Sequence, residues 1–404
     1  MKMFKKHKIL VCALLLCLPL AAGCEEAPNR SAAGTEAEEN AAEISDKYVS
    51  LEEAKRQVKE LEGNMLDGLR FPDYIEMPDV EAVCEVKLTP WHWKNEEEVE
   101  SAIKSMWADY DVVDWSAVEK KTFYNELIPD YIGYGKTDEE TGFLYSYDSQ
   151  GFFSGDSLND SEGEYVSCIA EYDFEWGDVM GDETYRLEDG EMSVAEAVLY
   201  TEKLLNEKLS ALEKNQFTYK VQHLYVMKNP GVDYYDFSMV VGRVYQDVFL
   251  DTSGAFCLYQ DAYYEKTHGG NHILAIMRHK NRLDYLNTCD ELLEVEETTE
   301  VDQIISPLYA AQLINERIAH VDNTRFEDGG LVYLPVQDNG KAKEHVQDIF
   351  QGVDDTTSLR PVWLFMMGKT AEIPVYLRPD MHGNSVIVDA IDGTLYYYEE
   401  TTPY

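Results

Sequence analysis

The chain has 404 residues, of which 45% are hydrophobic and 12% aromatic, so it can bury a sizeable core in two or three domains. Its 77 acidic residues outnumber the 34 basic ones, which gives a formal net charge of −43. A charge of this sign and size excludes nucleic acid and anionic lipid surfaces as electrostatically favoured partners.

The first 23 residues have the layout of a bacterial export signal. Residues 1–8 carry four lysines and no acid, and the apolar run 9–22 is shorter than the roughly 20 residues that a membrane span needs. The run ends in LPLAAGC (18–24), which resembles the lipobox of bacterial lipoproteins, with Ala21 where that family usually has Leu. The resemblance implies cleavage before Cys24, a diacylglyceryl thioether on its sulfur, and anchoring on the extracytoplasmic face of the cell membrane. A secretory signal that is cut without lipid is the alternative.

Residues 24–46 form a predicted tether. EEAPNRSAAGTEAEENAAEISD (25–46) contains seven acids, one arginine and no aromatic residue. Such a segment buries too little apolar surface to offset its chain entropy, so we expect disorder, although the alanines leave a helix as the alternative. Removal of 1–23 with its four lysines makes the remaining chain more acidic still.

The cysteines point to neither zinc nor thioredoxin-like chemistry. Cys12 and Cys17 leave with the signal and Cys24 is acylated, so that four remain: Cys84, Cys168, Cys257 and Cys289. They lie far apart and form no C-x-x-C. An exported protein can oxidise them, and Cys257 with Cys289 is then the preferred disulfide; buried free thiols are the alternative.

Residues 47–190 are expected to mix helices and strands. SLEEAKRQVKELEG (50–63) has the capping serine, early acids and terminal glycine of a helix, and NEEEVESAIKSMWADY (95–110) is a second helix with acids at its start. Between them, VEAVCEVKL (80–88) alternates as a strand does. Beyond residue 113 the signals are short and broken by Gly and Asp.

A clearer order begins at residue 191. Ser193 with Glu196 three places on opens a helix in 192–214, whose apolar stripe is Val194, Ala197, Val198, Leu204, Leu205, Leu209 and Leu212. The runs 217–228 and 234–251 are predicted strands that flank an Asn-Pro-Gly turn, which indicates an antiparallel hairpin, and 255–265 is a further strand.

A second set repeats this order. A helix in 301–321 is followed by predicted strands in 330–338, 360–369, 372–380 and 384–400. We therefore expect an α+β fold with two C-terminal units, 191–297 and 298–404, each with a helix packed on an antiparallel sheet, after a mixed N-terminal region 47–190. VFLDTSGAFCLY (248–259) and VIVDAIDGTLYY (386–397) echo one another, which a duplication or two generic hairpins would explain.

Two resemblances follow from these residues. The run Ser193-Val194-Ala195-Glu196-Ala197 and the turn Val388-Asp389 to Gly393 resemble parts of the PepSY-type modules of bacterial envelope proteins, in which a Ser-led helix is followed by strands and a closing V-D-x-x-x-G turn. The strand with Pro361-Val362-Trp363 resembles one in uncharacterised lipoproteins of Gram-positive gut bacteria. Neither resemblance implies a catalytic residue.

The sequence favours a protein that is not an enzyme. Ser101 and Lys104 match the S-x-x-K of penicillin-binding proteins, but they lie in an acidic amphipathic helix, and Lys369-Thr370 is followed by Ala371 instead of the glycine of K-T-G. G-x-S-x-G, H-E-x-x-H and the P-loop are not found. We expect no cofactor.

Two weak binding candidates remain. His268 and His272 in THGGNH (267–272) could bind a metal ion, although a plain hairpin tip is favoured. Trp91 and Trp93 are two apart, so in a strand their indoles share a face and could stack on a sugar, although core packing is favoured. We expect a membrane-anchored envelope protein that binds a protein partner, with glycan binding as the alternative and a hydrolase or metal-binding protein less favoured.

Overall fold

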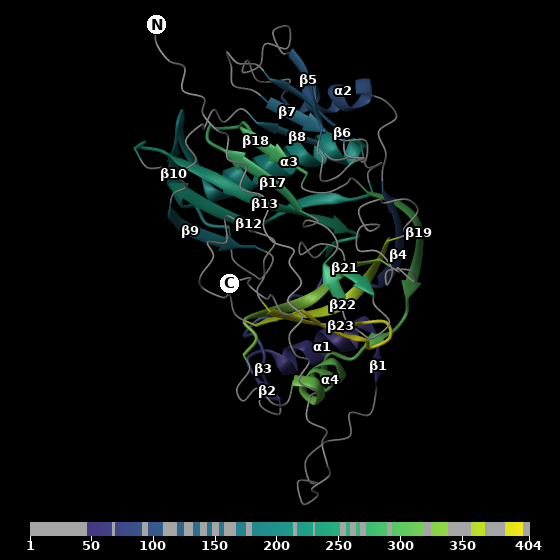
Figure 1. Ribbon diagram of the computed structural model, residues 1–404. Coiled ribbons are helices and arrows are strands. Elements are labelled where there is room, and N and C mark those ends of the chain that lie inside the picture. Colours follow the sequence, from purple (N-terminus) through teal and green to yellow (C-terminus); the bar gives the residue numbers. More distant parts are fainter. Residues whose placement is uncertain are drawn as a thin grey trace, which may run out of the picture. The chain divides into compact units, whose positions relative to one another are not determined.

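The computed structural model describes residues 47–66, 69–90, 96–107, 119–124, 132–137, 144–147, 153–156, 167–174, 180–212, 216–228, 231–250, 256–258, 264–266, 272–288, 293–318, 325–337, 357–367 and 384–398. In these parts four helices combine with mostly antiparallel sheets, as expected for an α+β chain (Figure 1). The predicted signal and the predicted tether, residues 1–46, lie outside the described residues.

One sheet has ten strands, and all its neighbouring strands are antiparallel. Their order is β5-β6-β7-β8-β18-β17-β13-β12-β9, with β14 paired to the end of β13. The bounds are β5 Glu119–Tyr124, β6 Ile132–Thr137, β7 Leu144–Tyr147, β8 Phe153–Asp156, β9 Ser167–Asp173, β12 Thr218–Lys228, β13 Tyr235–Tyr245, β14 Val248–Phe249, β17 His272–Met277 and β18 Tyr285–Asn287.

Helices α2 (Glu96–Met106) and α3 (Val194–Leu212) pack on this sheet and on each other. In α3 the predicted stripe is buried from Val194 to Leu209 and shares one core with α2 and with β12, β13 and β17. The expected cap is present, because Ser193 Oγ accepts from Glu196 N at 3.1 Å while Glu196 Oε2 accepts from Ser193 N at 2.9 Å.

The second sheet has eight strands. Its order is β16-β15-β21-β22-β23-β24, and β4 pairs with both β19 and β22. The bounds are β4 Val83–Pro90, β15 Phe256–Leu258, β16 Tyr264–Lys266, β19 Leu293–Val301, β21 Asp328–Gln337, β22 Thr357–Met367, β23 Asn384–Asp389 and β24 Leu395–Tyr398. Among the described pairs of this sheet, β15 with β21 is parallel, which the antiparallel expectation did not include.

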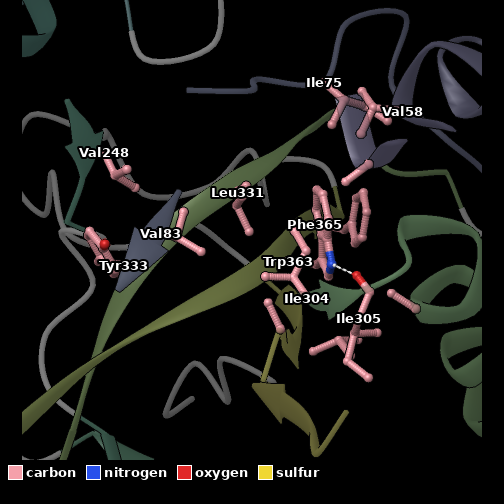
Figure 2. Packing of buried hydrophobic residues seen from close by; sticks show 14 of the residues in the cluster. Val58, Ile75, Val83, Val248, Ile304, Ile305, Leu331, Tyr333, Trp363 and Phe365 are labelled. Carbon is pink, nitrogen blue, oxygen red and sulfur yellow. Dashed lines mark hydrogen bonds between the residues drawn. The ribbon is translucent and has the colours of Figure 1, made fainter. Parts of the chain in front are cut away.

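Helices α1 (Leu51–Leu61) and α4 (Pro307–Ile318) lie side by side on this second sheet, below β22 and β23 in Figure 1. Trp363 of β22 is fully buried in the shared core, and its indole Nε1 donates to the carbonyl oxygen of Ile305 at 2.8 Å (Figure 2). The tryptophan of the P-V-W strand is therefore a core residue. Three two-stranded pairs complete the fold: β1 Tyr48–Val49 with β20 Ile304–Ile305, β2 Met65–Leu66 with β3 Leu69–Arg70, and β10 Thr184–Leu187 with β11 Gly190–Ser193.

A long insertion joins the two sheets. β4 ends at Pro90, and Pro90 is paired with Leu293 at the start of β19. Two neighbouring antiparallel strands are thus separated by residues 91–292, and this stretch contains every strand of the ten-stranded sheet as well as β15 and β16 of the other. The region 47–190 contributes strands to both sheets, β4 to one and β5–β9 to the other.

Two strand expectations are wrong. The run 255–265 is not one strand, because β15 and β16 pair antiparallel with each other, Leu258 with Tyr264. The run 234–251 was expected as a single strand, but β13 ends at Tyr245 and folds back into β14, with Tyr245 paired to Val248. The two residues between them, Gln246 and Asp247, both have positive φ, 47° and 62°. This is the backbone of a two-residue hairpin turn, and the sequence hides it because Asn-Gly or Asp-Gly is the usual signal.

Candidate functional site

Three turns meet at one end of the ten-stranded sheet: β10–β11, β12–β13 and β17–β18. The backbone N–H of Glu188 donates to the carbonyl oxygen of Arg278 at 2.9 Å, and the N–H of Lys280 donates to Asp189 Oδ1 at 2.8 Å. These bonds join the first turn to the third. We call the side chains that gather here the turn cluster: Tyr185, Arg186, Tyr234, Tyr235, Arg278, His279 and Arg282.

Tyr185 and Tyr235 of the turn cluster pack edge-on. The ring of Tyr185 lies 5.7 Å from that of Tyr235 and 5.9 Å from that of Phe237, in T-shaped contacts that join β10 to β13. Arg186, whose side chain is 62% exposed, pairs with Asp233 at 3.0 Å. The cluster therefore has a rigid aromatic base with an arginine that solvent can reach.

Arg278 is held from two sides. Its Nε and Nη2 donate to the two carboxylate oxygens of Asp236 at 3.1 and 2.9 Å, and its guanidinium lies 5.6 Å from the ring centre of Tyr234. Both side chains of the ion pair are at most 10% exposed. A bidentate, desolvated pair of this kind fixes the guanidinium plane and places Tyr234 beside it.

Asp284 organises the third turn. It is fully buried, and its carboxylate accepts from the backbone N–H groups of Arg278 and His279 at 2.8 and 3.0 Å and from Arg282 Nε at 2.7 Å. His279 Nδ1 lies 2.9 Å from Asp284 Oδ1, and its Nε2 lies 3.5 Å from Glu188 Oε2. One buried carboxylate thus orients the side chains of His279 and Arg282.

The geometry of the turn cluster suits recognition better than catalysis. A histidine oriented by a buried carboxylate can act as a general base, but the outer nitrogen of His279 faces the carboxylate of Glu188, not a hydroxyl or thiol, among the residues that the structure describes. Tyrosine and arginine on a pre-formed surface are the residue types that dominate protein–protein binding energy.

A second polar group lies inside the ten-stranded sheet. His223 Nδ1 is 3.4 Å from Asp173 Oδ1, and the imidazole stacks on Tyr225 with ring centres 6.4 Å apart. Burial raises the pKa of Tyr225, and the charges of Glu171 and Asp173 raise it further. Cys168 pairs with Met227, four residues along β12 from His223, a separation of about 13 Å. No Cys–His dyad forms here, and these side chains serve as polar packing.

Most of the sequence-predicted site residues lie outside the described residues. This holds for Cys24, Trp91, Trp93, His268 and Cys289. His272 and Cys257 are described in their backbone alone: His272 pairs with Gly242 in the sheet, and Cys257 lies in β15 opposite Glu265. The lipid, sugar, metal and disulfide expectations therefore stay predictions.

The other candidates from the sequence are two cysteines and the lysine of the S-x-x-K match. Cys84 and Cys168 are free thiols, and burial together with the charge of Glu300 raises the pKa of Cys84. Lys104 Nζ donates to Glu100 Oε2 at 3.1 Å, one helical turn before it on α2. Within the described stretches, no cluster of His, Cys, Asp and Glu could hold a metal ion, and no helix is long and apolar enough to cross a membrane.

Sequence reasoning missed the turn cluster, although a signal for it exists. Residues 278–282 read RHKNR, four basic side chains in five positions of a chain with net charge −43. Two of their acidic partners, Asp236 of β13 and Glu188 of the β10–β11 turn, come from distant parts of the chain, so the sequence alone does not show that they meet.

Comparison with known proteins bears on the fold alone. No family model matches the chain, and none of the curated proteins matches it. Among solved structures, the chain is similar to the crystal structure of an uncharacterized protein from Eubacterium rectale ATCC 33656, with a TM-score of 0.53 at 13% sequence identity. The similarity covers 84% of this chain and 92% of that one, so the two share the course of the fold over most of their length.

Proposed function

We propose that this chain is a lipid-anchored protein of the extracytoplasmic membrane face that acts, without catalysis, by binding another protein of the cell envelope through the turn cluster. The observation that carries the proposal is the pre-formed Tyr–Arg surface, in which the Arg278–Asp236 pair and the edge-on tyrosines are already in place. A surface held in this way loses little side-chain entropy on binding.

The position of the cluster supports this role. β12 begins next to Gln216, which bonds to Val295 of the other sheet, and ends at Lys228, whose Nζ lies 4.6 Å from the ring centre of Tyr235 in the cluster. Eleven strand residues span about 36 Å. The turn cluster therefore lies far along β12 from the contact between the sheets, where another protein can approach it.

Site-specific crosslinking in native cells tests the partner. A photoreactive residue at Asp233, whose side chain is 92% exposed, should give one discrete protein adduct, whereas the same residue at Glu207 on α3 should not. Tyr234→Ala with Arg186→Ala should lower recovery of the adduct about tenfold, the loss of one hot-spot contact. Equal adducts from both positions, or none from Asp233, would rule out the cluster as the binding surface.

The anchor has its own test, because it depends on Cys24 and not on the fold. The parent should incorporate labelled fatty acid and sediment with membranes, and Cys24→Ala should do neither. If the variant remained acylated, the lipobox interpretation would be wrong. If the parent and the variant were both exported without lipid and without membrane attachment, the signal would be an ordinary secretory one.

Glycan binding is the rival proposal, and it rests on Trp91 and Trp93. The parent should then be retained by peptidoglycan or surface polysaccharide. If retention were lost in Trp91→Ala with Trp93→Ala and kept in Tyr234→Ala with Arg186→Ala, the partner would be a glycan and not a protein. Lack of retention of the parent would remove this rival.

We also propose that 191–297 and 298–404 are related units, each a helix packed on an antiparallel sheet after the N-terminal region 47–190. Two parallels support this. Ser193 and Ser306 cap α3 and α4 in the same way, each Oγ accepting from the backbone N–H three residues on. Each helix also precedes three strands that are neighbours in their sheet, β12-β13-β17 and β21-β22-β23.

A further inference from the structure

The outer edge of β12 is completed by β9 over only half its length. β9 pairs with β12 from His223 to Lys228. Gln222 lies in a bulge and its carbonyl oxygen accepts from Phe174 N at 2.7 Å, next to β9. Among the described residues, 218–221 pair with β13 on their inner side, and the outer backbone groups of Tyr219 and Val221 face away from it. An open strand edge of this kind is a template for pairing with another chain.

Helix α3 occupies this part of the edge with side chains. Asn206 Nδ2 donates to the carbonyl oxygen of Tyr219 at 2.8 Å, and Asn206 Oδ1 accepts from Tyr219 N at 2.9 Å. Glu202 Oε1 accepts from Val221 N at 3.0 Å. Tyr219 and Val221 are two apart, so their backbone groups point to the same edge, and the helix makes the bonds that a neighbouring strand would make.

These capping side chains are rigidly placed. Leu205 and Leu209, next to them on α3, are fully buried in the core against the sheet. Asn206 also donates to the carbonyl oxygen of Glu202 at 2.7 Å, one turn earlier in the same helix. Both caps therefore depend on the packing of α3 and cannot swing away singly without losing buried bonds.

A side chain also bonds to the backbone of a strand in the second sheet. Gln216 Oε1 accepts from Val295 N at 2.6 Å and Gln216 Nε2 donates to Val295 O at 3.5 Å, beside the bulge that interrupts the β4–β19 register. A side-chain amide thus replaces a strand neighbour in both sheets. The repetition indicates a general need to close strand edges.

We propose that Asn206 and Glu202 of α3 are an edge cap that prevents residues 218–221 of β12 from pairing with the same edge of a second copy of this chain. A second copy fits because two identical edges can pair antiparallel about a two-fold axis. The segment TYKV (218–221) is rich in strand-forming residues and carries no acid, so it lacks the side chains that give the chain its net charge of −43.

The test uses the full chain and measures its oligomeric state by sedimentation over a range of concentrations in high salt, which screens the net charge. Asn206→Ala with Glu202→Ala should associate into dimers roughly tenfold more tightly than the parent. Lys203→Ala with Glu207→Ala, two exposed changes on the same helix, should leave the parent behaviour unchanged.

Two further variants separate edge pairing from loss of stability. Leu209→Ala weakens the packing of α3 but keeps both caps, so it should not associate. Adding Thr218→Glu to the uncapped variant should reverse the association, because each edge then carries a carboxylate that strand pairing would have to desolvate. The proposal fails if the uncapped variant stays as monomeric as the parent, if Leu209→Ala associates equally, or if Thr218→Glu has no effect.

Discussion

Gly155 lies against the indole ring of Trp107, which leaves no room for a side chain at position 155. A Cβ atom built at Gly155 would come within 2.3 Å of the indole, whose Nε1 donates to the buried carbonyl oxygen of Leu283 at 3.0 Å. The ring cannot shift without losing this bond. Neither residue can therefore change by itself without a cost in stability.

Gly155→Ala should lower the free energy of unfolding by about 1–3 kcal/mol, the usual cost of overpacking a core. Denaturant unfolding measures it. In a Trp107→Leu background, Gly155→Ala should lower the free energy of unfolding by less than it does in the parent, because the smaller leucine leaves room for the added methyl group. Strictly additive losses in the double variant would show that the two residues are not in contact.

Glu202 makes stability depend on pH. Burial raises the pKa of its carboxyl group, against the opposing effects of the Val221 N–H and the charge of Lys220. The folded state then binds more protons than the unfolded state between the two pKa values, so the Glu202 contribution to stability falls as pH rises through that window. The penalty is complete above the folded-state pKa.

Glu202→Gln keeps an oxygen that accepts from Val221 N and removes the charge. We expect the variant to be more stable than the parent at pH 7 and the difference to shrink as pH falls below the ordinary glutamate range. Urea unfolding at a series of pH values measures this difference. A constant difference at all pH values would mean that Glu202 does not titrate differently in the folded state.

At the scale of elements, the two serine caps have different surroundings. Ser193 shares its capping box with the exposed Glu196, whereas Ser306 is fully buried. Besides accepting from Tyr309 N at 3.2 Å, Ser306 Oγ donates to Gln57 Oε1 of α1 at 2.7 Å. The second cap thus also joins the two helices that cover the eight-stranded sheet.

Ser193→Ala should cost about 1 kcal/mol of unfolding free energy, the usual value of a helix cap. Ser306→Ala should cost about 2–3 kcal/mol, because it also leaves the buried oxygen of Gln57 without its donor. Parallel thermal and urea unfolding of the two variants compares them. Equal losses would mean that the Ser306–Gln57 bond adds nothing to the cap.

The closing turn of the C-terminal strands is also built locally. Asp389 is fully buried, its Oδ1 accepts from Ile391 N and Asp392 N at 2.7 and 3.2 Å, and Gly393 adopts a φ of 84°. Arg360 Nη2 bonds to Asp392 at 2.9 Å and its Nε bonds to Asp389. The V-D-x-x-x-G pattern therefore describes a real turn, since an Asx turn needs that spacing and a left-handed residue favours glycine.

At the scale of the whole molecule, the net charge of −43 opposes folding by self-repulsion. Raising the ionic strength from 0.1 to 1 M shortens the screening length from about 10 to about 3 Å. We expect the thermal midpoint to rise with sodium chloride, even though exposed ion pairs such as Lys87–Glu297 weaken. A midpoint that fell with salt would mean that the ion pairs outweigh the repulsion.

What sequence alone determined here is local. The cap of α1, the cap and apolar stripe of α3, the Asp389 turn and the hairpin of β12 and β13 depend on residues a few positions apart. The same interactions can form in a short peptide. The predicted signal and lipobox are likewise read from contiguous residues. The weak ligand candidates were contiguous too, and none of them belongs to the turn cluster.

Only the tertiary structure decided which strands meet. Pro90 pairs with Leu293 across a 91–292 insertion, Asp236 reaches Arg278 from another strand, and Asn206 completes the edge of β12. Alternating apolar strands are nearly interchangeable as sequence patterns, so pairing is chosen by the combined packing of both sheets and their helices, which no short stretch encodes.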